Sequence, residues 1–343
     1  MDSLLNHPNT AITDRMDSRL TQLSSYNLPW PVNWAELFGA ERPLILEIGF
    51  GYGHYLAFLH GEFPRHNIVG LEIDNFSLAK AERAIVNRRM DNVRVVHSRA
   101  ETALHHLFTP ASLEQVHVNF PDPWFKDRHA GRRLMQRDTL DAIVSRLRPG
   151  GLFYLATDIL PYAEMSAELL AATPGLSNHQ PAPWTHDRPL GVTTKYERRA
   201  REEGRPCYYF VYRRNDQPAP PVPVMEEQPM PHMVIQTPQS LDDIRDAVRL
   251  ESVAHDDIRL KFIKTYHGGD VLLFEVFVHE PTIDQRVAVV LVPRDEKPGE
   301  YTVKLSTLGM PRPTDGLHRA VRAVGEAILA LHPAAQIIHD KVR

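Results

Sequence analysis

Apolar runs of strand length alternate with segments of helix length between residues 43 and 215. The expected strands are residues 44–48, 68–71, 93–96, 116–119, 152–156 and 208–212. The expected helices lie near residues 55–62, 78–89, 101–107 and 137–147. Strands that are joined by helices run parallel, and a doubly wound sheet binds its ligand at the carboxyl ends of its strands. The alternation therefore predicts an α/β fold with a mostly parallel sheet.

A proline-rich segment separates this region from a different pattern downstream. Residues 216–238 hold closely spaced prolines and little periodic apolar content, which favours an extended linker. Beyond it, two runs alternate with period two, and apolar residues recur at helical spacing after an N-cap candidate, Thr314. We therefore expect an N-terminal segment (1–42), an α/β domain (43–215), a linker (216–238) and a smaller C-terminal α+β module (239–343). That module should contain an antiparallel sheet, and its sequence indicates no function.

The composition excludes several classes of protein. The 343 residues include a single cysteine, Cys207, which excludes a disulfide framework and a thiolate-only metal site. The histidines show no spacing that would place two of them on one helix face, and no apolar run approaches the length of a membrane span. The N-terminus lacks the layout of a signal peptide. We therefore expect a cytoplasmic protein with neither a metal nor a membrane partner.

The net charge of −4 conceals two cationic stretches. Residues 126–148 and 195–214 are rich in lysine and arginine, whereas the surplus of acidic residues lies mainly beyond residue 215. Such runs are most often solvated helix faces, so they do not establish nucleic-acid binding without further evidence.

A glycine-rich turn follows the first expected strand, in the sequence Glu47-Ile48-Gly49-Phe50-Gly51-Tyr52-Gly53. A dinucleotide-binding turn would need a final glycine at position 54, which is His54. An acid followed by three alternate glycines instead suits a positively charged ligand without phosphate, such as S-adenosylmethionine. Glu72, after the second strand, is placed to accept hydrogen bonds from ribose hydroxyls. The alternative is that Glu47 is a satisfied strand-end acid and Glu72 begins a helix.

The segment from Asn119 to Lys126 follows the fourth strand and contains Asp122 between two prolines. Proline fixes its own φ angle and restricts the residue before it, so this carboxylate lies in a rigid, extended setting. Trp124 follows, and then a dense cationic run. A rigid acid beside a flat ring and several guanidinium groups suits a purine base with phosphates attached. Nucleic-acid chemistry is the leading hypothesis.

Together these residues resemble the bacterial tRNA (guanine-N7-)-methyltransferase family, the TrmB type, over residues 30–215. The resemblance is carried by Trp34, Phe38, Pro43 and residues 47–53, 70–72, 121–134, 156–158 and 194–197. It implies a Rossmann-like, class I fold that uses S-adenosylmethionine. It also implies methyl transfer to N7 of guanine 46, in the variable loop of tRNA, by a tRNA-modifying enzyme.

The resemblance also implies roles for individual residues. The cofactor site would comprise Glu47, Gly49, Gly51, Gly53, Glu72, Asp122 and the aligned position Arg99. The RNA substrate would contact Lys126, Asp158, Thr194, Lys195, Tyr196 and Glu197, and phosphates would contact Arg128, Arg132 and Arg133. Because N7 of guanine already presents a lone pair, no general base is required. Asp122 or Asp158 would act in catalysis by stabilising the positive charge that develops on the guanine ring.

The sequence departs from the family at three places. Arg99 stands where the family often has an acid or asparagine that meets the adenine, so Glu101 or a backbone amide near Ala100 would have to do so. Phe125 replaces a proline, and the C-terminal module lies outside the family core. Two alternatives remain: another nucleic-acid methyltransferase that uses S-adenosylmethionine, and a non-catalytic RNA-binding protein on the same fold. Both a monomer and a homodimer fit the sequence.

Overall fold

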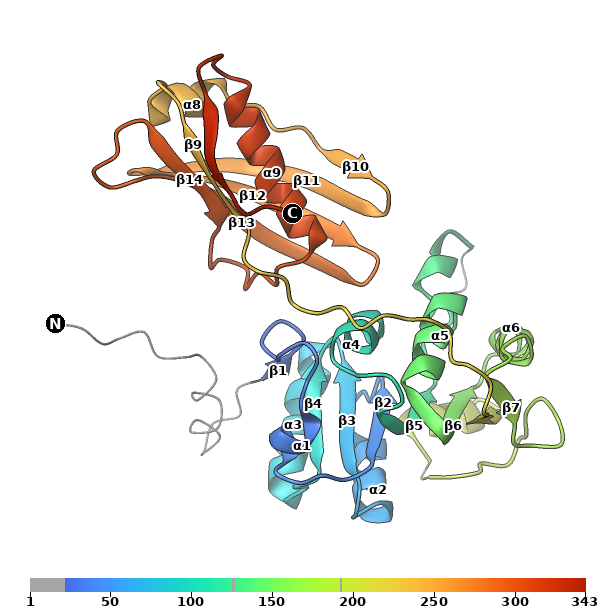
Figure 1. Cartoon of the computed structure of the whole chain (residues 1–343). Helices are drawn as coiled ribbons and strands as arrows, with labels where there is room; N and C mark the ends of the chain where they lie inside the picture. The colour runs from blue at the N-terminus through green and yellow to red at the C-terminus, as the bar shows by residue number, and fades with distance from the viewer. Residues whose placement is uncertain (1–21, 125–126, 192) are drawn as a thin grey trace. The chain divides into compact units, whose positions relative to one another are not determined.

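A computed structural model describes residues 22–124, 127–191 and 193–343, and Lys126 lies outside them. The chain divides into two compact units, the first ending at Val224 and the second running from Met225 to Arg343 (Figure 1). Each unit has a sheet of its own. No helix among the described residues is both long and apolar enough to cross a membrane.

The first unit is built on a sheet that has eight strands in the described residues. Their order is β1 (Leu23–Ser24), β4 (Val93–His97), β3 (Asn67–Glu72), β2 (Leu44–Ile48), β5 (Leu113–Asn119), β6 (Leu147–Thr157), β8 (Tyr208–Arg214) and β7 (Leu176–Asn178). All neighbours from β1 to β6 pair in parallel. Strand β8 pairs antiparallel with both of its neighbours, β6 and β7. Every residue of β2 is buried, as expected for a central strand covered on both faces. The prediction of a mostly parallel α/β sheet is confirmed.

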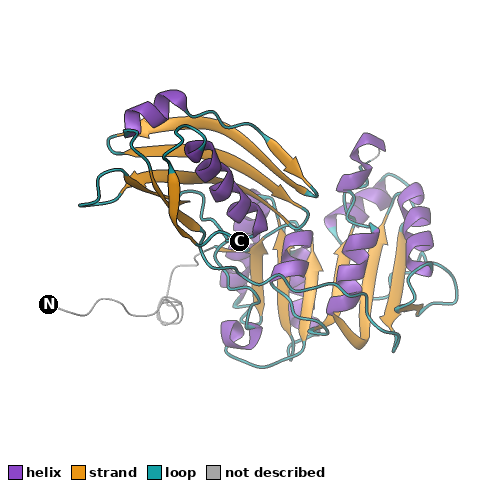
Figure 2. Ribbon diagram, turned by 45° about the horizontal axis from the view of Figure 1, so that its top comes forward, coloured by secondary structure: helices purple, strands orange, loops and turns teal. Residues whose placement is uncertain are grey.

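Helices connect these strands and pack along them (Figure 2). They are α1 (Trp34–Phe38), α2 (His54–Glu62), α3 (Asn75–Arg88), α4 (Ala100–His106), α5 (Arg137–Arg146), α6 (Leu160–Ala171) and α7 (Lys195–Glu202), with a 3-10 helix η1 (Asp127–Arg132). One buried apolar cluster joins α2 and α3 to strands β2, β3 and β4. The turns between strand and helix therefore gather at the carboxyl ends of β2, β3, β4 and β5.

The second unit is an antiparallel sheet with two helices. Its strands, in spatial order, are β10 (Val253–His255), β11 (Ile258–Gly268), β12 (Val271–Glu280), β13 (Ile283–Pro293), β14 (Glu300–Leu305), β9 (His232–Gln236) and β15 (Gln336–Asp340). Helix α9 (Asp315–Leu329) buries an apolar stripe, including Leu317, Val321 and Val324, in one core with the sheet, and α8 (Leu241–Ala247) precedes β10. The expected C-terminal α+β architecture is confirmed.

Thr314 occupies the N-cap position of α9 as predicted, but its side chain does not cap the helix. Its hydroxyl donates to the buried carboxyl of Glu280, and the other oxygen of that carboxyl accepts from the Gly316 amide at 3.0 Å. An acid from β12 therefore takes the capping role through a contact that is distant in sequence.

The proline-rich segment 216–238 is divided between the two units. Strand β9 lies inside it, because the apolar run from Met233 to Ile235 pairs with both β14 and β15. The earlier part of the segment packs on the first unit, where it meets Arg146 at the end of α5. The segment is therefore not one continuous spacer, because both ends provide contacts that the proline pattern did not reveal.

Arg146 is fully buried, and its guanidinium donates to four oxygens. These are the carbonyl of Leu104 at 2.7 Å, the hydroxyl of Ser145 at 2.8 Å, and the carbonyls of Val222 at 3.1 Å and Pro223 at 2.9 Å. Burial lowers the pKa of Arg146, because the charged form loses its hydration. Two of the four acceptors that offset this loss come from the proline-rich segment.

Candidate active site

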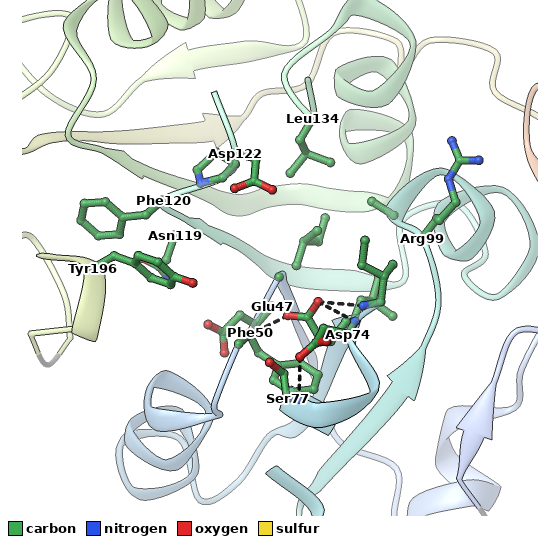
Figure 3. Close-up of a pocket in the computed structure, with 18 of the residues that line it drawn as sticks. Glu47, Phe50, Asp74, Ser77, Arg99, Asn119, Phe120, Asp122, Leu134 and Tyr196 are labelled. Carbon is green, nitrogen blue, oxygen red and sulfur yellow. Dashed lines mark hydrogen bonds between the residues drawn. The ribbon is translucent and has the colours of Figure 1, made fainter. Parts of the chain in front are cut away.

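A cavity of about 730 Å³ opens in the first unit at the carboxyl ends of the parallel strands (Figure 3). Most of its lining comes from five segments, namely residues 47–52, 71–74, 98–101, 119–122 and 194–196, with Trp124, Arg132 and Leu134 at one side and His54, Tyr55 and Ser77 from helices α2 and α3. The strand-to-helix turns bring these loops together, as the Rossmann-like order requires.

The glycine turn has the backbone geometry that its sequence predicts. Gly49 and Gly51 both have positive φ angles, of 74° and 54°, and a Cβ atom at either position would meet no atom within 4 Å. Gly53 also has a positive φ angle, but a Cβ there would lie 3.1 Å from the Cβ of Ala81 on α3. Gly49 and Gly51 therefore line the cavity, whereas Gly53 lets the turn pack against α3.

Glu47 is the acid of this turn, and its side chain is held away from water. The residue is 1% exposed, and its Oε2 atom has no hydrogen-bond partner among the described residues. Burial raises the pKa of Glu47 to about 8, and the nearby carboxylate of Glu72 adds to the rise. The Asn119 amide opposes it, although Asn119 Nδ2 meets no acceptor with good hydrogen-bond geometry. A cation that enters the cavity would lower the pKa of this carboxyl and favour its ionised form.

Glu72 shapes the entrance to this turn through its two carboxylate oxygens. Oε2 accepts from the amide of Gly51 at 3.0 Å, and Oε1 accepts from the amides of Ile73 at 2.8 Å and Asp74 at 3.1 Å. Asp74, and not Glu72, caps α3, by accepting from the Ser77 amide at 2.8 Å. Glu72 faces the cavity, and its Oε2 atom, which accepts only one of these hydrogen bonds, keeps a further lone pair for a ligand hydroxyl.

Arg99 is the N-cap residue of α4 and lines the cavity. Its side chain makes no capping hydrogen bond and pairs with Glu101 at 3.5 Å. Ser98, Ala100 and Glu101 line the same wall. This wall therefore presents the first residues of α4 and the Ser98 hydroxyl to the cavity, with Arg99 between them.

The loop after β5 is strained on both sides of Asp122. Phe120 and Trp124 have positive φ angles of 53° and 42°, which typically cost about 1–3 kcal/mol each in residues other than glycine. Arg133 holds the loop by donating to the carbonyls of Pro123 at 3.1 Å and Trp124 at 3.2 Å. The exposed Asp122 carboxylate is thereby fixed at the cavity wall.

The predicted phosphate-binding arginines differ in their surroundings. Arg132 lines the cavity and lies over the Trp124 ring, 5.2 Å from its centroid. Arg128 is exposed on η1. The guanidinium of Arg133 donates to backbone carbonyls. This position suits support of the loop better than contact with a phosphate. Its sequence neighbours gave no sign of that difference.

Asp158 follows β6 and is paired with Arg205, which also contacts Glu203 at 2.7 Å. Asp158 is not among the described residues that line the cavity. Of the two acids, Asp122 therefore lines the cavity, whereas Asp158 is held in an ion pair with Arg205.

The four residues from Thr194 to Glu197 serve two different purposes. Thr194 caps α7 by accepting from the Glu197 amide at 3.2 Å, and Lys195 and Tyr196 line the cavity with it. Glu197 is not among the described residues that line the cavity: its side chain is fully buried and paired with Arg188 and Arg201. Glu197 therefore anchors the helix that presents its three predecessors. Arg188 lies outside the family motif, so sequence reasoning missed it.

The fold and the cavity define a Rossmann-like methyltransferase that uses S-adenosylmethionine. The pattern of a family described as "Putative methyltransferase" matches residues 41–210. The chain is 33% identical to the tRNA (guanine-N(7)-)-methyltransferase of Thermus thermophilus over 306 residues, covering 88% of this chain and 94% of that protein. It is 37% identical to the Cupriavidus metallidurans protein of the same name over 188 residues, covering 54% of this chain and 72% of that protein. The chain belongs to the tRNA (guanine-N7-)-methyltransferase family.

Solved structures are similar to the chain at lower identity. A 16S rRNA methyltransferase, KamB, superposes with a TM-score of 0.42 at 16% identity, covering 57% of this chain and 99% of that one. The aminoglycoside resistance methyltransferase NpmB1 superposes with a TM-score of 0.39 at 17% identity, covering 56% and 94%. Among the described residues, no group of three or more His, Cys, Asp or Glu side chains is arranged to hold a metal ion.

Proposed function

We propose that this chain transfers a methyl group from S-adenosylmethionine to N7 of guanine 46 in the variable loop of tRNA. Its family membership supports the reaction, and one observation in the cavity supports it most directly. The buried, unpartnered Oε2 of Glu47 lies at a glycine turn, across the cavity from the loop that carries Asp122. A cationic methyl donor would pair with the Glu47 carboxylate, and a guanine would donate hydrogen bonds to the Asp122 carboxylate.

Three parts of the lining would hold the donor. Glu47 would pair with its positive charge, Glu72 would accept from the ribose hydroxyls, and the wall from Ser98 to Glu101 would meet the adenine. When bound, S-adenosylmethionine supplies an electrophilic methyl group. The open faces of Gly49 and Gly51 leave room for a close approach to the backbone.

The chain's own contribution to the reaction would be to position and to select the guanine. N7 needs no deprotonation, so correct placement can provide much of the acceleration, up to roughly 7–11 kcal/mol in well-oriented systems. The Asp122 carboxylate can accept from N1–H and from the exocyclic amine, which adenine does not present at the same places. It can also stabilise the positive charge that grows on the ring.

The product of the reaction tests this proposal. Full-length protein is incubated with labelled S-adenosylmethionine and either a tRNA transcript with guanine at position 46 or the same transcript with adenine there. We expect label only in the first transcript, and chain cleavage at position 46 after reduction and aniline treatment, because N7-methylation weakens the glycosidic bond. Methylation at an exocyclic amine would instead identify the other class of methyltransferase, and S-adenosylmethionine binding without transfer would identify a non-catalytic RNA-binding protein.

Asp122→Asn and Asp158→Asn form a matched pair, since each removes one carboxylate charge. Asp122→Asn should lower the single-turnover rate at saturating S-adenosylmethionine about tenfold or more, because Asp122 faces the cavity. Asp158→Asn should lower the rate less and the melting temperature more, because it removes the charge that pairs with Arg205 and leaves that guanidinium with Glu203 alone. Equal losses of rate in the two variants would contradict the assignment to Asp122.

A further inference from the structure

Two lysines and two aromatic rings gather at the rim of the cavity. Tyr52 lies in the glycine turn, and the Nζ atom of Lys80 lies 4.0 Å from the centroid of its ring. The same Nζ atom lies 4.4 Å from the centroid of the Phe76 ring, one helical turn earlier on α3. Lys195, at the start of α7, places its Nζ atom 4.9 Å from the Tyr52 ring. We call these four residues the lysine clamp.

The rings hold the lysines without neutralising them. Tyr52 and Phe76 meet edge to face, with centroids 6.1 Å apart and planes at 76°. Each cation–π contact attracts an ammonium group to the face of a ring and leaves its charge in place. In the part of the chain that the structure describes, neither Lys80 nor Lys195 forms an ion pair with a carboxylate. Two ammonium groups are therefore fixed at one ring while their N–H donors remain available to an anion.

Two anions could reach this rim: the carboxylate of the donor and a phosphate of the RNA. Lys80 and Phe76 are not among the described residues that line the cavity, so they stand outside the space that a donor would fill. The surrounding surface is apolar and open, because Ile73 is 63% exposed, Phe76 60% and Tyr196 56%. Cations interleaved with exposed aromatic rings are typical of surfaces that bind single-stranded nucleic acid. These features favour RNA over the donor.

We propose that the lysine clamp binds a phosphate of the RNA strand beside the target guanine. This inference rests on the proposed function, because it identifies where the same substrate is gripped. Lys80 and Lys195 would contact the phosphate, and Tyr52 and Phe76 would act as positioning residues that keep the two ammonium groups in place. A contact with the backbone adds affinity and orientation without reading the base.

Binding of full-length protein to tRNA at several salt concentrations tests the clamp. For Lys80→Ala we expect the Kd for tRNA to rise about threefold to tenfold at low salt. The slope of log affinity against log salt should also fall by about 0.7–0.9, the value of one lost phosphate contact. The Kd for S-adenosylmethionine should not change. Arg88→Ala, which removes one exposed cation from the far end of α3, is the matched control and should behave as wild type.

The outcomes separate the clamp from the proposed function. An unchanged salt slope, or a weaker affinity of Lys80→Ala for S-adenosylmethionine instead of for tRNA, would overturn the clamp while wild-type methylation of tRNA still stood. A wild-type protein that neither binds nor methylates tRNA would overturn both.

A double-mutant cycle tests whether the rings act through the lysines. Tyr52→Leu and Lys80→Ala should each weaken tRNA binding, and the double variant should lose less than the product of the two separate losses. A ring that only supported the fold would not change the salt slope of the variant. Independent, fully multiplicative losses would contradict positioning by Tyr52.

Discussion

Replacement of Glu47 by glutamine should stabilise the ligand-free protein and, near pH 7.5, weaken S-adenosylmethionine binding by about a hundredfold, because the amide cannot pair with a cation. The stabilisation follows from burial: the carboxyl has a pKa of about 8 in the folded chain against 4.5 for the isolated group. Ionising it therefore costs folding free energy, and one pKa unit corresponds to about 1.4 kcal/mol. An amide of the same shape should recover about 3 kcal/mol of this cost, which raises the melting temperature by about 6–12 °C.

The direction of the pH dependence follows from the raised pKa. Below pH 4.5 the carboxyl is neutral in both the folded and the unfolded chain, and it adds no penalty. Between pH 4.5 and 8 the unfolded chain releases the proton first, so the free energy of unfolding of the wild type falls as pH rises. Above pH 8 the penalty is constant. Glu47→Gln should lack this slope, whereas Glu164→Gln, an exposed control on α6, should keep it.

Binding should show the opposite trend. A cationic ligand requires the carboxylate, so the affinity of the wild type should rise by up to tenfold for each pH unit below 8. Calorimetry between about pH 6 and 7.5, where an α-amino group stays mostly protonated, measures this rise and the proton released into buffers of different ionisation enthalpy. Wild-type affinity that is independent of pH in that range would show that Glu47 does not meet the donor's charge.

Two truncations that differ by nine residues should differ sharply in stability. A chain that ends at Asn215 loses the carbonyls of Val222 and Pro223, and the buried Arg146 is left with two of its four acceptors. Hydrogen bonds to a charged group typically contribute about 1.5–3 kcal/mol each. We therefore expect the free energy of unfolding of the first unit to fall by about 3 kcal/mol or more.

A chain that ends at Val224 keeps all four acceptors and is the matched control. Thermal unfolding of both should show a melting temperature lower by about 6–12 °C for the shorter chain. Arg146→Met should remove the difference between the two truncations, because no buried charge then needs the carbonyls. Equal melting temperatures for the two truncations would show that water replaces the lost acceptors.

Much of the first unit could be predicted because its information is local. Strand ends in a parallel sheet meet at one edge, so Glu47, Glu72 and Asp122 could be assigned to one cavity from their positions after strands. The glycine turn was predictable for the same reason, since positive φ angles at Gly49 and Gly51 are a property of the turn itself. Both conclusions need only a strand, its end and the next few residues.

The remaining features depend on contacts between distant segments. Asp158 was predicted to contact the RNA, and this stays a prediction; its ion pair with Arg205, 47 positions later in the chain, could not be predicted from its neighbours in the sequence. Glu197 matches a family motif, yet its partner Arg188 belongs to no motif. Phe76 and Lys80 are four residues apart on a helix, and only the fold brings Tyr52 and Lys195 to them. No pattern within one element contains these pairings.

The guanidinium of Arg146 recognises backbone carbonyls, and every amino acid carries a carbonyl. The side chains of the proline-rich segment near Val222 and Pro223 can therefore change in evolution, provided that the segment stays extended. Prolines suit this purpose, because they favour the extended form and have no N–H that would compete for an acceptor. In related chains, we therefore expect that the second unit can be replaced by a different domain, or be missing, when the chain is changed only after the position of residue 224.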